Sequence, residues 1–482
     1  MNTKEKNKEK AFSTIGKSSF ITVVMILVTA MVLSGILSYI IPQGSFEIDK
    51  ETEAIIPGTY QGGEIKGIAV WRILTAPVRV FASDDALTVI MISVFLLVMS
   101  GVFNLLDKTG GTRAVIGRLI RRLHDKGAPV ICLCVLIFML FGSFFGMFEE
   151  LVTLVPLVVM FTLSMGMDTM TGLGACMMAA CFGFSAAITN PFSVGLATSI
   201  AGTAVSDGMW LRIVFFALIY AVLCSFLMLH LKRIERNPSL SPSYKSDLAR
   251  REEATRQLSD SIPTDKEHRL FRVWGMFFLV QGVLLVLIAS VRAISDYAIP
   301  ILAAGFLIGG IIAGLMVCEK KSDTAIHFLS GACAMLPAVV LIALASSVKL
   351  IMTESKIIHT IMNFVISALD GKSPIVCVLL IFVLILVLQV FIGSSSAKIM
   401  LVMPIVMPIA SSLGISPATI ILAYCMADGF TDVILPTNPV LLVGLSMANV
   451  SYGKWFKWTW KLQVLVLALS VGILSLATVI NY

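Results

Sequence analysis

The chain has 482 residues, of which 57% are apolar and only 13% are Asp, Glu, Lys or Arg. Soluble domains carry roughly 25% charged residues, because charge has to cover their surface. This composition excludes a soluble enzyme, a disordered protein and a disulfide scaffold, and it predicts an all-α polytopic membrane protein in a lipid bilayer. The formal net charge of +7 comes from loop segments, which is typical of membrane topology and argues against nucleic-acid binding.

The first predicted element is a membrane span. Residues 1–19 are polar and rich in lysine, and we expect them to form a cytoplasmic tail. The apolar run Phe20–Ile41 that follows is long enough to cross a hydrocarbon core of ~30 Å. A signal peptide has only ~7–15 apolar residues before its cleavage site. We therefore predict a retained first span with a cytoplasmic N-terminus.

Three loops differ in positive charge. Residues 107–127 and 232–272 are dense in Lys and Arg, whereas residues 42–85 contain few. Because positively charged loops stay in the cytoplasm, the first two are predicted to be cytoplasmic and the third to lie outside. The chain then divides into a first membrane repeat over residues 20–231, a cytoplasmic linker over 232–272, and a linking span with a second membrane repeat over 273–482.

A repeated motif relates the two membrane segments. Thr189-Asn190-Pro191 recurs as Thr437-Asn438-Pro439, at an offset of 248 residues. Two homologous halves are typical of secondary transporters. The last span of the first half is followed by the basic linker, so that span ends in the cytoplasm. Lys and aromatic residues precede the last span of the second half, so that span begins in the cytoplasm. We therefore predict inverted halves and a C-terminus outside. The same offset relates Pro156 to Pro404, Gly166 to Gly414, Ala175 to Ala423, Phe182 to Phe430 and Trp210 to Trp458.

Each half contains a small polar stretch between two apolar arms. In the first half this stretch is 141–150, with Ser143, Glu149 and Glu150; in the second half it is 393–398. Irregular backbone at membrane depth survives only where protein buries it or where it lines a wet cavity. We predict re-entrant hairpins near residues 128–165 and 374–413, with tips that meet near the midplane.

The two Thr-Asn-Pro motifs predict discontinuous helices near residues 172–206 and 415–449. Proline removes a backbone N–H and disfavours helix at the preceding residue. A broken helix frees carbonyl groups at one half-helix end and N–H groups at the other, and these bind cations and anions respectively. We expect an Na⁺ site at the Asn190 and Asn438 breaks and no other metal site. A simple proline kink is the structural alternative.

Ionisable residues within apolar segments complete the candidate site. A charge near the midplane costs several kcal/mol unless it is paired or hydrated, so such residues usually line a pathway. Asp428 and Asp432 are four residues apart and share one face if the helix continues between them, whereas Asp168 falls near a segment end and is predicted to be interfacial. The structural alternative is an ion pair of Lys398 with Glu149 or Glu150 that only holds the hairpins. The candidate substrate- or ion-binding residues are Ser143, Glu149, Glu150, Thr189, Asn190, Ser394, Ser395, Ser396, Lys398, Asp428, Asp432, Thr437 and Asn438.

Several stretches resemble the YfcC-like family. They are residues 146–150 (Gly-Met-Phe-Glu-Glu), 187–195 (around Thr189-Asn190-Pro191), 393–396 (Gly-Ser-Ser-Ser) and 428–432 (Asp-Gly-Phe-Thr-Asp). This family groups C4-dicarboxylate anaerobic carrier-like proteins with basic amino-acid antiporters, within the ion-transporter superfamily. The resemblance implies two opposed hairpins, two unwound helices and a homodimer. Lys398 departs from the family's small or apolar residues after the second hairpin tip, which leaves Na⁺ or H⁺ open as the coupling ion.

We therefore expect a multi-pass secondary carrier of the bacterial inner membrane that moves a small charged metabolite by alternating access. Four carboxylates against one lysine favour an amino acid, such as a basic one. The alternative substrate is a C4-dicarboxylate, held by half-helix N-termini, Ser394–Ser396 and Lys398. A channel and a non-transporting membrane sensor are the rival classes. No Walker A, Gly-x-Ser-x-Gly or His-Glu-x-x-His motif occurs, so we expect neither an enzyme nor a cofactor.

Overall fold

The protein is almost entirely helical, and the expected all-α membrane fold is confirmed. Among the residues that the structure describes, five helices are long and apolar enough to cross a membrane, and shorter apolar helices accompany them: the five cover Val89–Lys108, Met209–Arg236, Pro300–Val317, Lys321–Glu354 and Tyr452–Val479. A computed structural model describes residues 17–47, 56, 59–84, 86–111, 114–115, 118, 127–152, 154–248, 250, 264–290, 298–367, 369 and 371–482. Most of the predicted N-terminal tail, of the basic loop after residue 111 and of the middle of the linker lies outside these residues.

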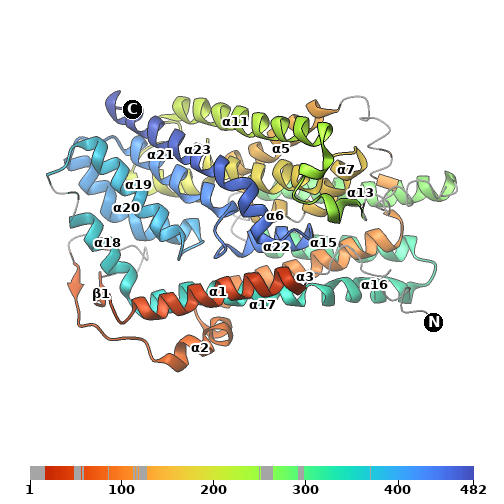
Figure 1. Ribbon diagram of the computed structural model, residues 1–482, viewed down its shortest axis with the longest axis horizontal. Helices are drawn as coiled ribbons and strands as arrows, with labels where there is room; N and C mark the ends of the chain where they lie inside the picture. The colour runs from red at the N-terminus through yellow and green to blue at the C-terminus, as the bar shows by residue number, and fades with distance from the viewer. Residues whose placement is uncertain are drawn as a thin grey trace.

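One group of helices, here called the scaffold, packs together along one side of the molecule (Figure 1). Within it α15 and α16 pack on α3, α1 and α2 pack on α17, and α13 packs on α15. These elements are α1 (Lys17–Leu37), α2 (Val70–Arg79), η1 (Val80–Ala82), α3 (Ala86–Lys108), α13 (Thr264–Ser290), α15 (Ala298–Val317), α16 (Lys321–Ala334) and α17 (Leu336–Glu354).

The second group, here called the core, contains both predicted helix breaks. Its first unit comprises α5 (Ala128–Phe145), α6 (Glu149–Val152), α7 (Val155–Ser164), α8 (Thr169–Leu173), the π-helical turn η3 (Gly174–Met178), α9 (Ala179–Ser185), the π-helical turn η4 (Pro191–Gly195), α10 (Leu196–Ala201) and α11 (Met209–Arg236), followed by η5 (Pro238–Leu240). Its second unit comprises α19 (Pro374–Gln389), α20 (Ser395–Ser412), α21 (Pro417–Asp428), η6 (Phe430–Val433), α22 (Pro439–Met447) and α23 (Tyr452–Val479). Helices α17 and α22 make the main contact between scaffold and core.

The two units of the core share local conformations at the 248-residue offset. Gly166 and Gly414 both turn the chain in the left-handed region, with φ of 80° and 71°. Asn190 and Asn438 both cap the following helix, because each side-chain oxygen accepts a hydrogen bond from the N–H two residues on. The equivalent helices α11 and α23 run antiparallel, because Trp210 near the start of α11 packs on Tyr482 beyond the end of α23, and His230 near the end of α11 bonds Trp458 near the start of α23. The inversion of the complete halves stays a prediction.

The second half of each broken helix packs against the other unit. The η4–α10 segment of the first unit contacts α20 and α21, and α22 of the second unit contacts α6 and α7. Phe182 and Phe430, which occupy equivalent positions, meet edge to face with ring centroids 5.2 Å apart. The units are therefore interlocked around the two breaks, which fixes the irregular backbone in the middle of the molecule.

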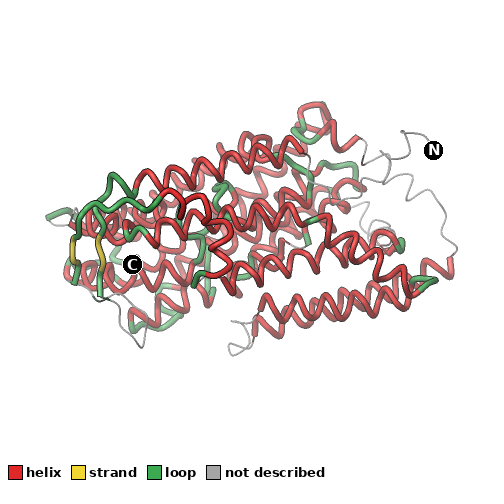
Figure 2. Tube along the Cα trace, turned by 90° about the horizontal axis from the view of Figure 1, so that it is seen from below, coloured by secondary structure: helices red, strands yellow, loops and turns green. Residues whose placement is uncertain are grey.

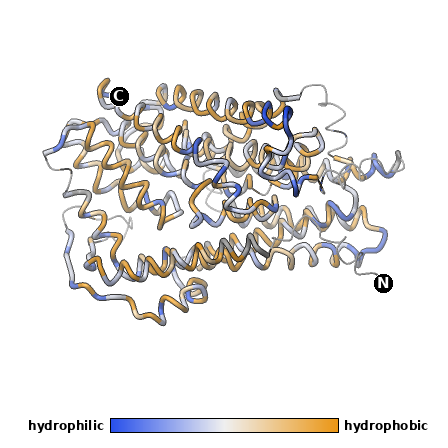
Figure 3. Tube along the Cα trace, in the orientation of Figure 1, coloured by the Kyte–Doolittle hydropathy of each residue, from blue (hydrophilic) through white to orange (hydrophobic). Residues whose placement is uncertain are grey.

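A small antiparallel pair of strands covers the end of the molecule opposite the linker (Figures 1 and 2). Strands β1 (Gly44–Ser45) and β2 (Gln61–Gly62) pair Gly44 with Gly62 and Ser45 with Gln61. They pack on α18 (Ile357–Ser367), where the Phe46 N–H donates to His359 Nδ1 at 3.0 Å. Figure 3 shows hydrophilic residues gathered at the linker end and along this strand-bearing loop, with apolar helices between.

Candidate functional site

Ser143, in the last turn of α5, connects that helix to the first helix break. Its carbonyl accepts hydrogen bonds from the N–H groups of residues 188, 189 and 190, at 3.0–3.2 Å. Its hydroxyl donates to the Ala186 carbonyl at 2.7 Å and accepts from the Ile188 N–H at 2.9 Å. Thr189 donates to the Phe144 carbonyl, and Asn190 lies against Gly146. The hairpin turn thus satisfies backbone groups that the break leaves without helical partners.

The second break is satisfied by the last helix instead. Gln463 Nε2 donates to the Phe430 carbonyl at 2.8 Å, Trp455 Nε1 to the Val433 carbonyl at 2.5 Å, and the Tyr452 hydroxyl to the Ile434 carbonyl at 2.7 Å. The Cys181 thiol, from the first unit, donates to the Gly429 carbonyl at 3.0 Å. Each of these four carbonyls accepts one hydrogen bond, and the cation site expected at this break stays a prediction.

Two carboxylates of the second break hold the two arms of the second hairpin. Asp428 forms an ion pair with Lys398 of α20, and Asp432 accepts a hydrogen bond from Gln389 Nε2 of α19. All four side chains are buried, with Lys398 0% and Asp428 1% exposed. Asn438 lies beside Asp432, which brings a Thr-Asn-Pro motif to the same cluster. The hairpin arms are therefore linked to the break through charge.

The helix does not continue between Asp428 and Asp432, so the condition for their sharing one helix face is not met. Helix α21 ends at Asp428, and the chain continues through Gly429 into the 3₁₀ turn η6. The break therefore begins at Gly429, several residues before Pro436. This early end places the Asp428 carboxylate at the C-terminus of a half-helix.

Several buried polar atoms around this cluster lack a hydrogen-bond partner among the described residues. The contact between Lys398 Nζ and Asp428 is an ion pair without hydrogen-bond geometry, and most native buried polar groups are hydrogen-bonded. Such a concentration indicates a site that is not built for stability alone. The atoms are Ser193 Oγ, Gln389 Oε1, Ser395 Oγ, Lys398 Nζ, both Asp428 carboxylate oxygens, Thr431 Oγ1 and Gln463 Oε1.

The remaining predicted residues lie around these contacts. Glu149 is half-buried at the start of α6, Thr437 is half-buried in the break, and Ser394 is exposed and caps α20. Ser395 accepts a hydrogen bond from the buried Tyr424 hydroxyl at its carbonyl, at 2.7 Å. The side chains of Glu150 and Ser396 lie outside the described part of the structure. Among the described residues, no group of three or more His, Cys, Asp or Glu is arranged to hold a metal ion.

Sequence reasoning missed Gln389, Tyr424 and Arg212. Gln389 and Tyr424 each occur singly in apolar runs, where a polar residue gives no sign of its partner. Arg212 is 2% exposed and donates to the carbonyls of Val205 and Asp207. Its only signal was a charge in the first turn of a long apolar helix.

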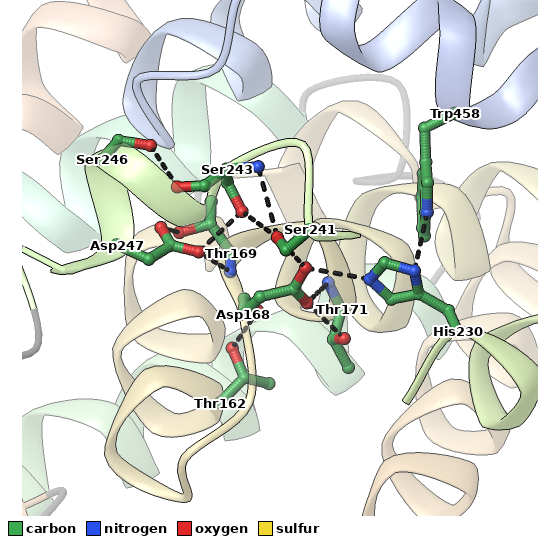
Figure 4. Close-up of polar contacts among 10 residues, drawn as sticks. All are labelled: Thr162, Asp168, Thr169, Thr171, His230, Ser241, Ser243, Ser246, Asp247 and Trp458. Carbon is green, nitrogen blue, oxygen red and sulfur yellow. Dashed lines mark hydrogen bonds and ion pairs between the residues drawn. The ribbon is translucent and has the colours of Figure 1, made fainter. Parts of the chain in front are cut away.

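A second polar cluster lies near the linker and holds Asp168, which is buried at the start of α8 (Figure 4). Asp168 accepts hydrogen bonds from His230 Nε2 at 2.8 Å, the Ser241 hydroxyl at 2.6 Å and Thr171. Burial raises the pKa of Asp168, but these donors outweigh it and leave the pKa below its usual value. Trp458 Nε1 donates to His230 Nδ1 at 3.1 Å, so the cluster ties the linker to α8, α11 and α23.

Known proteins resemble this chain over most of its length. YfcC of Escherichia coli (strain K12), named provisionally as a basic amino acid antiporter, is 26% identical over 477 residues, covering 90% of this chain and 92% of YfcC. An uncharacterized protein of Haemophilus influenzae is 26% identical over 407 residues, covering 83% of this chain and 77% of that protein.

Two solved transporter structures align with most of this chain at low similarity. One is the YdaH transporter of Alcanivorax borkumensis, with 18% identity, coverage of 96% of this chain and 98% of YdaH, and a TM-score of 0.41. The other is MtrF of Neisseria gonorrhoeae, described with a class of antimetabolite efflux pumps, with 15% identity, coverage of 95% of each chain and a TM-score of 0.44. The family model described as C4-dicarboxylate anaerobic carrier matches residues 19–480. The chain is therefore a multi-pass membrane transporter that belongs to the C4-dicarboxylate anaerobic carrier (DcuC) family.

Proposed function

We propose that this transporter is a secondary carrier that moves a cationic amino acid by alternating access. The observation that carries the proposal is the buried cluster in which two carboxylates, Asp428 and Asp432, face one ammonium group, that of Lys398. A buried carboxylate without a matching cation is costly, so a second positive group is favoured there. A basic amino acid supplies that group.

Its relatives support this substrate class and an alternative. YfcC carries a name that refers to basic amino acids, and it matches nearly the whole chain. The family description refers to C4-dicarboxylates, and two features suit such an anion. Arg212 adds a second buried cation to the core, and Ser394–Ser396 begin a helix whose N-terminus favours negative charge. A C4-dicarboxylate is therefore the second candidate.

The coupling ion and the assembly complete the proposal. We propose that transport is coupled to H⁺ or Na⁺. The basic segments and the strand-bearing loop lie at opposite ends of the molecule (Figure 1). This arrangement supports a carrier of the bacterial inner membrane with its linker in the cytoplasm. We expect it to act as a homodimer.

A thermal-shift titration of the purified protein tests the substrate class. A ligand that binds only the folded state raises the melting temperature with its concentration. We expect arginine to raise it, Asp432→Asn to remove the effect, and the matched change Glu319→Gln, at an exposed carboxylate paired with Lys266, to keep it. Stabilisation by succinate and not by arginine would assign the site to dicarboxylates. Repeating both titrations with and without Na⁺ identifies the coupling ion.

A further inference from the structure

The ion pair between Lys398 and Asp428 lies at two helix ends that do not suit its charges. Lys398 is the fourth residue of α20, near the N-terminus of that helix, and Asp428 is the last residue of α21. A helix N-terminus carries partial positive charge and a C-terminus partial negative charge. The ammonium therefore lies near the positive end of its own helix, and the carboxylate at the negative end of its own.

The pair also lacks the contacts that would make it a strong structural link. An ammonium group has three donors, yet Lys398 Nζ has no hydrogen-bond partner among the described residues. Both Asp428 carboxylate oxygens are likewise without a hydrogen bond, although the residue is 1% exposed. The two charges are therefore paired with each other without hydrogen bonds from the rest of the described residues.

The first unit lacks the carboxylate of this pair. At the 248-residue offset, Glu150 corresponds to Lys398 and Ala180 to Asp428. Ala180 is fully buried in α9 and carries no charge. The equivalent position of the fold therefore does not require a buried carboxylate, which is particular to the second unit.

We propose that Asp428 is a binding position for an ammonium group and that the side chain of Lys398 occupies it. The primary ammonium group of the transported amino acid displaces Lys398 and pairs with Asp428. Displacement of Lys398 frees the N-terminus of α20, beside Ser394 and the unpartnered Ser395 hydroxyl, for the substrate carboxylate. The second cationic group of a basic amino acid then faces Asp432. This inference rests on the proposed function, and it adds that the Lys398 ammonium occupies the binding site when no substrate is bound.

Removal of the tethered ammonium is the direct test. The probe is n-propylammonium chloride, titrated against the full-length protein in detergent with the melting temperature as readout. We expect Lys398→Ala to bind the probe at least tenfold more tightly than the parent protein does. The double change Lys398→Ala, Asp428→Asn should lose that binding. Lys454→Ala removes an exposed lysine from the first turn of α23 and should behave as the parent does.

Equal or weaker probe binding by Lys398→Ala would overturn the proposal. Loss of succinate-dependent stabilisation in the same variant, without a gain for the probe, would instead make Lys398 a ligand of an anion. Lys398→Met, similar in length but neutral, repeats the test if the alanine variant does not fold. Neither readout requires transport. A parent protein that fails to exchange arginine therefore contradicts the proposed function, whereas the role of Lys398 is decided separately by the probe titrations.

The parent protein offers a measurement that requires no variant. Amine-specific acetylation followed by mass spectrometry reports the reactivity of Lys398, which is 0% exposed. Displacement predicts that arginine increases acetylation of Lys398 and leaves that of Lys454 unchanged. A structural ion pair predicts no increase, and that result would also overturn the proposal.

Discussion

In the first hairpin and break, residues 128–201, Ser143 connects turn and break through backbone hydrogen bonds. In the second, residues 374–447, Lys398 and Gln389 connect the hairpin arms to the break through Asp428 and Asp432. The backbone breaks at corresponding Asn-Pro positions in both units and is capped by asparagine in the same way. Among the described side chains, the buried carboxylates at these breaks belong to the second unit. The same backbone break is thus bonded through a serine in one unit and through charged side chains in the other, and we propose that the substrate binds chiefly to the second unit.

Loss of a carboxylate in the second unit should have the largest effect on transport. Asp432→Asn keeps the size of the side chain but removes the charge that receives a cationic group. We expect arginine uptake into proteoliposomes to fall roughly 100-fold, since truncating a buried charged partner costs about 2–5 kcal/mol of binding. Glu319→Gln is the matched control, and a similar loss in that variant would show a general defect instead.

Breaking the ion pair should have the largest effect on stability. Asp428→Asn leaves the Lys398 ammonium buried and unpaired, which costs about 3–5 kcal/mol. Adding Lys398→Met removes that charge and should restore most of the loss. Chemical denaturation in detergent, followed by tryptophan fluorescence, measures both. A full loss that the second change does not recover would mean that Asp428 acts through contacts other than the pair.

The two hairpin turns should differ in their sensitivity to serine removal. Ser143→Ala leaves the Ala186 carbonyl without its hydroxyl donor, while the Ile188 N–H keeps its bond to the backbone carbonyl of residue 143, and we expect a loss of about 1–3 kcal/mol. Ser394→Ala removes only an exposed helix cap and should cost about 0.5–1 kcal/mol. Melting temperatures of the two variants, measured side by side, decide the point. Equal decreases in melting temperature would show that the hydrogen bonds of Ser143 to the helix break add no more stability than the exposed cap of Ser394 does.

The smallest effect concerns the equivalent helix caps Asp168 and Ser416. Because the pKa of Asp168 in the folded protein lies below its ordinary value of 3.8, its contribution to stability is complete above that pH. It is lost as the pH falls through the lower, folded-state pKa. Melting temperatures between pH 6 and pH 3 should therefore decline less steeply at the acid end for Asp168→Asn than for the parent. Ser416→Ala should leave the slope unchanged.

The sequence predicted the helix breaks well because proline and a repeated motif act on the local backbone. Pro191 and Pro439 each begin the second half of a broken helix, as expected. The partner of Lys398 could not be predicted, because it depends on how α20 packs against α21. The end of α21 at Asp428 was missed as well, since Gly429 gives a weaker local signal than the prolines that follow. The burial of Asp168 could not be predicted either, because it depends on contacts with His230 and the linker, which are distant in the sequence.

Substrate counterflow in proteoliposomes tests the central claim most directly. Vesicles that contain the protein are loaded with unlabelled arginine, and the entry of labelled arginine is followed with the parent protein and with Asp432→Asn. The account predicts rapid exchange by the parent, no acceleration in vesicles loaded with succinate, and loss of exchange in Asp432→Asn. Exchange of succinate in place of arginine, or arginine entry that internal arginine does not accelerate, would contradict a cationic amino-acid carrier built on the second helix break.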